Sequence, residues 1–244
     1  PAAPPQAPDT SEETFRKGYV NKYTIGSMLD ELKWVVPNRV MQDMPSIIET
    51  DPGRFIDLAA HNILAGFDRE SVISRRILVH DIMRNFYQSD VIVITLGLAE
   101  GWRDRVSGIS VIDAPISLKG CDPDRFELEV ASHQDVIDGL ENIAALLNQY
   151  GRSSWRMIIT VSPVPFLASF TGDDVVVANS YSKAVLRSAA EEFVRRHDRV
   201  DYFPSYEMAM YSNTEAVWKS DRRHIRRDFV AAIIDHFCRS YIAS

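Results

Sequence analysis

The feature that most constrains the fold is a continuous apolar run, Val91-Ile-Val-Ile-Thr-Leu96, that ends at Gly97. Strands buried on both faces of a parallel sheet have this composition, whereas half-solvated strands alternate apolar and polar residues. A second such run covers Met157–Val161 and is followed by two prolines, and a shorter one covers residues 200–203. We therefore expect Val91–Leu96 and Met157–Val161 to be neighbouring parallel strands with both faces covered by helices.

Helical patterns lie before, between and after these runs. They cover residues 69–87, 132–150, 181–196 and 225–242, and Ser132 is expected to cap the second of them. Alternating strands and helices imply right-handed crossovers and a parallel sheet between two helix layers. Residues 1–13 are rich in Pro, Ala and acidic side chains and are expected to be a flexible lead-in, which leaves residues 14–244 as a single domain.

Charge and cysteine content exclude several classes of protein. The formal net charge of -7 argues against a general nucleic-acid surface, which needs a basic excess. The two cysteines lack the spacing of a zinc site or a redox pair, which fits a reducing, cytoplasmic compartment. No apolar run is long enough to cross a bilayer, and the histidines show no metal-ligand pattern. We expect neither a metal nor a cofactor.

Ligands of open parallel sheets bind beyond the carboxyl ends of the strands. The segment after the first run is therefore a candidate site, with Gly97 allowing a backbone N–H to approach a ligand closely and Glu100 nearby. Trp102 would either wall this pocket or pack within the loop. Asn179 is expected to begin a helix and to face the same site.

An Asp-x-x-His pattern, Asp221 and His224, precedes the last helical segment. An aspartate there can hold one imidazole nitrogen and raise the basicity of the other, as in hydrolytic triads. The alternative is that Asp221 only caps the helix and His224 lies exposed in an Arg-rich turn. Two serines were weighed as nucleophiles: Ser162 lacks the glycines of a nucleophile elbow, and Ser27 follows Gly26 without a preceding buried strand.

Several segments together resemble the GSCFA family, a branch related to the SGNH (GDSL-like) hydrolases. The resemblance is carried by Thr95–Trp102, Thr160–Pro165, Tyr181–Arg187 and Tyr202–Glu207, and Gly18–Thr24 resembles the family segment that follows the nucleophile region. It spans residue 18 to the C-terminus.

This resemblance implies a flavodoxin-like three-layer α/β sandwich and ester chemistry on an O-acyl group through a Ser-His-Asp triad. Asp221 and His224 would take the orienting and base positions. Gly97 matches the glycine of the Gly-x-Asn-Asp block, but Ala99 stands where the oxyanion asparagine is expected. Asn21 or Asn179 would have to replace that asparagine.

The Gly-Ser-Cys-Phe-Ala motif that names the family is absent, and in the family it lies upstream of the segment matching Gly18–Thr24. We therefore expect a chain that begins after its nucleophile and lacks the first strand of its sheet. The sheet should then be open beside Val91–Leu96, Ser27 should lie outside hydrogen-bond reach of His224, and the chain should be inactive alone.

The sequence thus predicts a serine-dependent O-acyl esterase or O-acyltransferase, acting on an acylated small molecule or glycan. The missing nucleophile and Ala99 leave a second hypothesis open, a non-catalytic glycan-binding module of the same fold.

Overall fold

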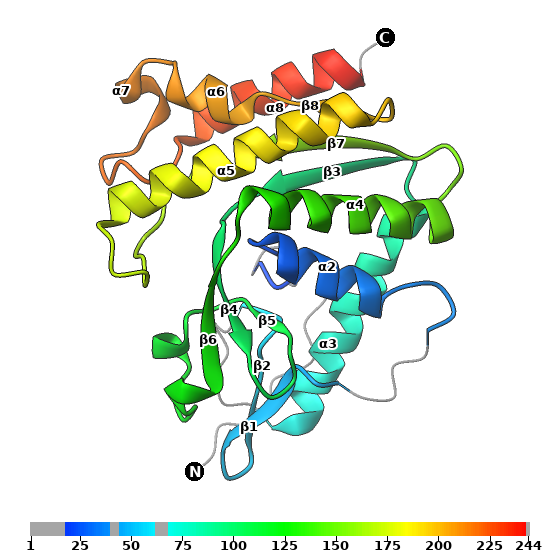
Figure 1. Ribbon diagram of the computed structural model, residues 1–244, viewed down its shortest axis with the longest axis vertical. Coiled ribbons are helices and arrows are strands. Elements are labelled where there is room, and N and C mark those ends of the chain that lie inside the picture. Colours follow the sequence, from blue (N-terminus) through cyan, green and yellow to red (C-terminus); the bar gives the residue numbers. More distant parts are fainter. Residues whose placement is uncertain (1–17, 40–43, 62–67, 243–244) are drawn as a thin grey trace.

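The computed structural model describes residues 18–39, 44–61 and 68–242, and shows an α/β fold built around a parallel sheet (Figure 1). Strands β3 (Val91–Leu96), β7 (Arg156–Val161) and β8 (Val200–Tyr202) are parallel and lie in the order β3-β7-β8. Val91 pairs with Arg156 and Leu96 pairs with Val161. The predicted parallel pairing of these two runs is therefore confirmed.

Helices form layers on this sheet. Figure 1 shows α2 (Ile25–Trp34), α4 (His133–Tyr150) and α5 (Val175–Arg196) gathered against it, with α4 packed between the other two. Apolar side chains of these helices and of β3 and β7 form the main core, in which Leu140, Ile143 and Met157 are fully buried. The half of the fold that contains the parallel sheet also includes α6 (Ser205–Met210), α7 (Thr214–Val217) and α8 (Arg227–Tyr241).

Two smaller antiparallel sheets were not predicted, and Figure 1 shows them below the parallel one. One is the hairpin of β1 (Ile47–Asp51) and β2 (Arg54–Asp57), and the other contains β4 (Glu100–Asp104), β5 (Ser110–Val111) and β6 (Phe126–Val130) in the order β5-β4-β6. They share a second core with Trp34 and Leu118. Helix α3 (Arg69–Met83) and the short 3-10 helices Arg84–Gln88, Pro115–Ser117 and Pro123–Arg125 complete this half.

Short polar side chains set where the helices begin. Thr24 and Ser132 form capping boxes with the third residues of α2 and α4, which confirms the predicted cap at Ser132. The helix expected from residue 181 begins earlier, at Val175, because Asp174 accepts a hydrogen bond from Val176 N. Three consecutive β-branched valines concealed this start. Asn179 therefore lies inside α5 instead of beginning it.

Strand β3 departs from the expected burial. Ile92, Ile94 and Leu96 are buried, but Val91 and Val93 are 54% and 51% exposed, so one face of β3 is uncovered and that part of the prediction is wrong. The carbonyl groups of the even-numbered residues of β3 accept hydrogen bonds from the β7 side; Leu96 O, for example, accepts one from Ser162 N, just after β7. The N–H and C=O groups of the odd-numbered residues therefore point to the opposite edge of β3. Within the described ranges no strand pairs with that edge.

The expected flexible lead-in, residues 1–13, lies outside the described residues. Among the described residues, no helix has the length and apolarity needed to span a bilayer.

Candidate active site

The segment after β3 is held against the chain's own backbone. Leu98 N donates to Tyr23 O at 2.8 Å, and a Cβ placed on Gly97 would lie 2.8 Å from the same carbonyl oxygen. A side chain larger than hydrogen would therefore clash with backbone. The sequence predicted a glycine that lets a ligand approach, but in this structure the close neighbour of Gly97 is Tyr23.

Helix α5 fastens the same segment from the other side. Ser182 Oγ accepts from Ala99 N at 2.9 Å, and Lys183 Nζ donates to Gly97 O at 2.8 Å. Both side chains are buried, at 1% and 3% relative exposure. The backbone N–H of Ala99 is therefore already used within the protein.

Glu100 and Trp102 lie on strand β4 and not in a loop, and both hold the segment between β7 and α5. Glu100 Oε2 accepts from Ser169 Oγ and Oε1 accepts from Phe170 N, each at 2.7 Å. The rings of Trp102 and Phe170 meet edge to face, with centroids 5.5 Å apart. The buried carboxylate of Glu100 thus anchors a loop beside the carboxyl end of β3.

The two asparagines weighed as oxyanion donors lie in different settings. Asn179 Oδ1 accepts from Phe166 N at 3.1 Å, which fastens the same loop to α5 and leaves Nδ2 as its remaining donor group. Asn21 is exposed, and its Nδ2 is 3.5 Å from the hydroxyl of Tyr23. Asn179 is therefore beside the candidate site, whereas Asn21 faces solvent.

Asp221 and His224 form the predicted pair. Asp221 Oδ2 lies 2.6 Å from His224 Nδ1, and Asp221 Oδ1 accepts from the backbone N–H groups of Arg223 and His224 at 3.0 Å each. Arg222, at φ 51°, makes the left-handed turn that brings them together. Hydrogen bonds from these two N–H groups and from the imidazole hold the pKa of Asp221 far below its ordinary value, so the carboxylate stays charged.

The pair is exposed, with the side chain of His224 at 53% and that of Asp221 at 47%. Arg223 NH1 lies 3.3 Å from His224 Nε2, so the nitrogen that would act as base now faces a guanidinium. Figure 1 shows the connection from α7 to α8 on the side toward which β3 points. No polar contact of the pair within the described chain reaches Gly97 or Trp102.

The two candidate serines make local contacts. Ser27 is buried in the capping box of α2, and its hydroxyl donates to Thr24 O at 2.9 Å. Ser162 Oγ accepts from Val164 N at 3.3 Å. Neither hydroxyl is hydrogen-bonded to His224 in the described part of the chain. Ser27 therefore takes part in starting helix α2.

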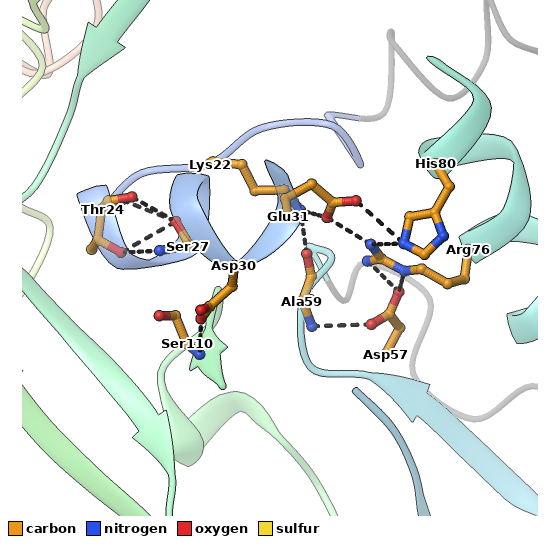
Figure 2. A network of polar contacts seen from close by, with 10 residues as sticks. All are labelled: Lys22, Thr24, Ser27, Asp30, Glu31, Asp57, Ala59, Arg76, His80 and Ser110. Atoms are coloured by element: carbon orange, nitrogen blue, oxygen red, sulfur yellow. Dashed lines mark hydrogen bonds and ion pairs between the residues drawn. The ribbon is translucent and has the colours of Figure 1, made fainter. Parts of the chain in front are cut away.

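Sequence reasoning missed a buried ionic cluster between α2, α3 and the end of β2 (Figure 2). Its members point toward one another in Figure 2: Lys22, Glu31, Asp57, Arg76 and His80. Arg76 NH1 donates to Glu31 at 2.6 Å, Arg76 Nε donates to Asp57 at 2.6 Å, and Lys22 Nζ is 2.8 Å from Glu31. The four-residue spacing of Arg76 and His80 on one face of α3 was the available signal.

The protonation states of this cluster follow from its burial and its charges. Burial would raise the pKa of Glu31, but Arg76 and Lys22 outweigh it and lower that pKa to about 2. Burial, with Arg76 beside it, lowers the pKa of His80 to about 4. An ionised Glu31 and the guanidinium of Arg76 therefore lie beside a neutral His80, and the cluster joins three segments of the fold.

Within residues 18–39, 44–61 and 68–242, no three His, Cys, Asp or Glu side chains are arranged so that they could hold a metal ion. Residues 9–237 match the model of the GSCFA family. No curated protein matches the chain.

Proposed function

Because this chain belongs to the GSCFA family, we propose that it is part of a serine-dependent O-acyl esterase or O-acyltransferase of the SGNH hydrolase type, acting on an acylated small molecule or glycan. In this proposal Asp221 and His224 activate a serine carried upstream of residue 1. The observation that carries the proposal is the 2.6 Å contact between Asp221 Oδ2 and His224 Nδ1.

The chemistry follows from the roles of the two side chains. Asp221, held ionised, fixes the tautomer with hydrogen on Nδ1 and stabilises the imidazolium that forms. His224 Nε2 removes the proton of the serine hydroxyl as its oxygen attacks the acyl carbonyl, and returns that proton to the departing alcohol. Water or a second hydroxyl then accepts the acyl group, so hydrolysis and transfer share every earlier step. Arg223 must leave Nε2 before the serine can approach it.

The open side of the sheet supports a nucleophile from a further segment. Among the described strands none pairs with the outer edge of β3, and one more parallel strand would satisfy the N–H and C=O groups of that edge. Helix α8 has an apolar side that includes Val230 and Ile234, yet none of its residues is buried. Both of these apolar side chains are exposed. A strand added beside β3 would end next to the Gly97–Ala99 segment, where the candidate site lies.

One set of contacts favours the alternative, a non-catalytic glycan-binding module. Leu98 N and Ala99 N already donate to Tyr23 and Ser182, so this segment has fewer N–H groups free to stabilise an oxyanion. A binding module needs no such donors.

The test uses an activated ester, 4-nitrophenyl acetate, and the chain extended by the upstream segment that the proposal requires. We expect turnover, and we expect His224→Ala to lower kcat/KM about a thousandfold or more while the protein still unfolds cooperatively. His133→Ala is the matched control, because His133 is also partly exposed and lies 3.3 Å from a carboxylate of Glu192. Equal activity of the two variants would exclude the proposed base, and a wild-type protein that binds glycans without turnover would favour the binding module.

A further inference from the structure

A groove of about 750 Å³ runs along the outer side of α5, where Tyr206 and Met210 of α6 form its other wall. Asn179, Lys183 and Arg187 line it at successive turns of α5, since they are spaced four residues apart. The side chain of Lys183 reaches from this wall to the carbonyl of Gly97, so the groove adjoins the segment that follows β3.

The cations of the groove differ in their partners. Arg187 lies 2.6 Å from Glu207 and 3.0 Å from Glu191, so its charge is balanced. Lys183 has the Gly97 carbonyl as its acceptor and forms no ion pair with any carboxylate in the described part of the chain. Two of its three N–H groups therefore have no acceptor among the described residues.

A buried ammonium without a counter-charge is unfavourable, because desolvation is not offset by an ion pair. The comparison within this chain is Lys22, which is equally buried but lies 2.8 Å from Glu31. Burial lowers the pKa of Lys183 to about 8, so the side chain is still mostly protonated at neutral pH. Lys183 is one of the residues that line the groove, and a protonated ammonium without a carboxylate partner attracts an anion that binds there.

We propose that the groove beside α5 binds a carboxylate-bearing ligand, whose carboxylate pairs with the ammonium of Lys183. The amide Nδ2 of Asn179, one helical turn away, supplies a second donor, because Oδ1 is used by Phe166 N. Glu191 and Glu192 also line the groove and disfavour a doubly charged phosphate relative to a singly charged carboxylate.

This inference goes beyond the proposed function, since the groove would bind a carboxylate whether or not the chain takes part in ester chemistry. The carboxylate has two possible sources, the acid released from an acyl group or the acid group of a sugar. Acetate represents the first source and glucuronate the second, and glucose is the neutral control.

The experiment titrates each compound at pH 7 into protein carrying ¹³C-labelled lysine and follows the side-chain signal of Lys183. A saturable shift with acetate or glucuronate, but not with glucose, is expected, and the stronger of the two identifies the source. Lys183→Met should abolish saturable binding, whereas Lys119→Met, which removes an exposed lysine, should leave it unchanged. Saturable binding that persists in Lys183→Met would overturn the proposal.

Proton linkage provides a second readout that a merely structural lysine would not give. Affinity should fall about tenfold between pH 7 and pH 9, because the ammonium loses its proton over that interval. Affinity that is constant over this range, or no saturable shift with either acid, would overturn the proposal even if Lys183→Met fails to fold. Binding should also survive His224→Ala, which separates this site from the proposed triad.

Discussion

Replacing Arg76 by Met tests whether the buried ionic cluster holds the two halves of the fold together. The guanidinium of Arg76 is fully buried and lies against Glu31 and Asp57, at 2.6 Å and 2.5 Å. Methionine keeps most of the apolar contacts, including those near Trp34, but removes the charge. Both carboxylates then lose their shared partner in a site that excludes water.

The structure sets the size of the effect. Removing one partner of a buried ion pair costs about 3–5 kcal/mol, because the remaining charge stays desolvated. Lys22 remains beside Glu31 and limits the loss there, but Asp57 has no second ion-pair partner within the described residues. A loss of about 3–5 kcal/mol is a large part of the 5–15 kcal/mol typical of a folded domain.

Urea unfolding followed by circular dichroism measures this loss, with unchanged m-values as the condition for comparing variants. The matched control is Arg84→Met, since Arg84 pairs with Asp81 at 2.6 Å near the end of the same helix, but both side chains are about half exposed. Exposed pairs contribute less than about 1 kcal/mol. If Arg76→Met costs no more than Arg84→Met, the stabilising role of the cluster is refuted.

Two further predictions concern acid stability and packing. The pKa of His80 in the folded protein is about 4, below its ordinary value of 6.5. As the pH falls, the unfolded chain therefore binds a proton at His80 before the folded protein does. The stability that is present above pH 6.5 is lost as the pH falls toward 4. Urea unfolding at pH 7 and pH 5 should show this loss, and His80→Gln should reduce it; an equal loss in both proteins would contradict the assignment. Gly139→Ala should lower the Tm, because the new Cβ would lie 2.3 Å from Ile25 Cγ1, although alanine is favoured in a helix by about 1 kcal/mol. The same change should raise the Tm in an Ile25→Ala background, and destabilisation in both backgrounds would show that Ile25 is not the cause.

Local signals were enough to predict the parallel sheet and several helix starts. Both strands were identified from their continuous apolar runs, which β7 owes to burial on both faces, whereas β3 has the same composition although one of its faces is uncovered. Ser132 was identified as a cap because its chemistry acts within one turn of helix. The start of α5 was misplaced because its cap, Asp174, precedes three valines that resemble a strand.

In the candidate site, too, the sequence predicted contacts between nearby residues but not contacts between distant ones. Asp221 and His224 were predicted as a pair because they lie three positions apart and one turn brings them together. The roles of Glu100 and Asn179 could not be read locally, since their partners are Phe170 and Phe166, in a segment that only the fold brings near. The ion pair of Glu31 and Arg76 joins residues 45 positions apart, which no spacing rule identifies.

Covalent labelling tests directly whether a serine upstream of residue 1 is the nucleophile that His224 activates. The chain, extended by the upstream segment that the proposal requires, is treated with an organofluorophosphonate, which phosphonylates an activated serine, and the labelled peptide is identified by mass spectrometry. We expect one labelled serine upstream of residue 1 and loss of labelling in His224→Ala, because the proposed serine depends on His224 as its base. Labelling of Ser27 or Ser162, or equal labelling in His224→Ala, would contradict it.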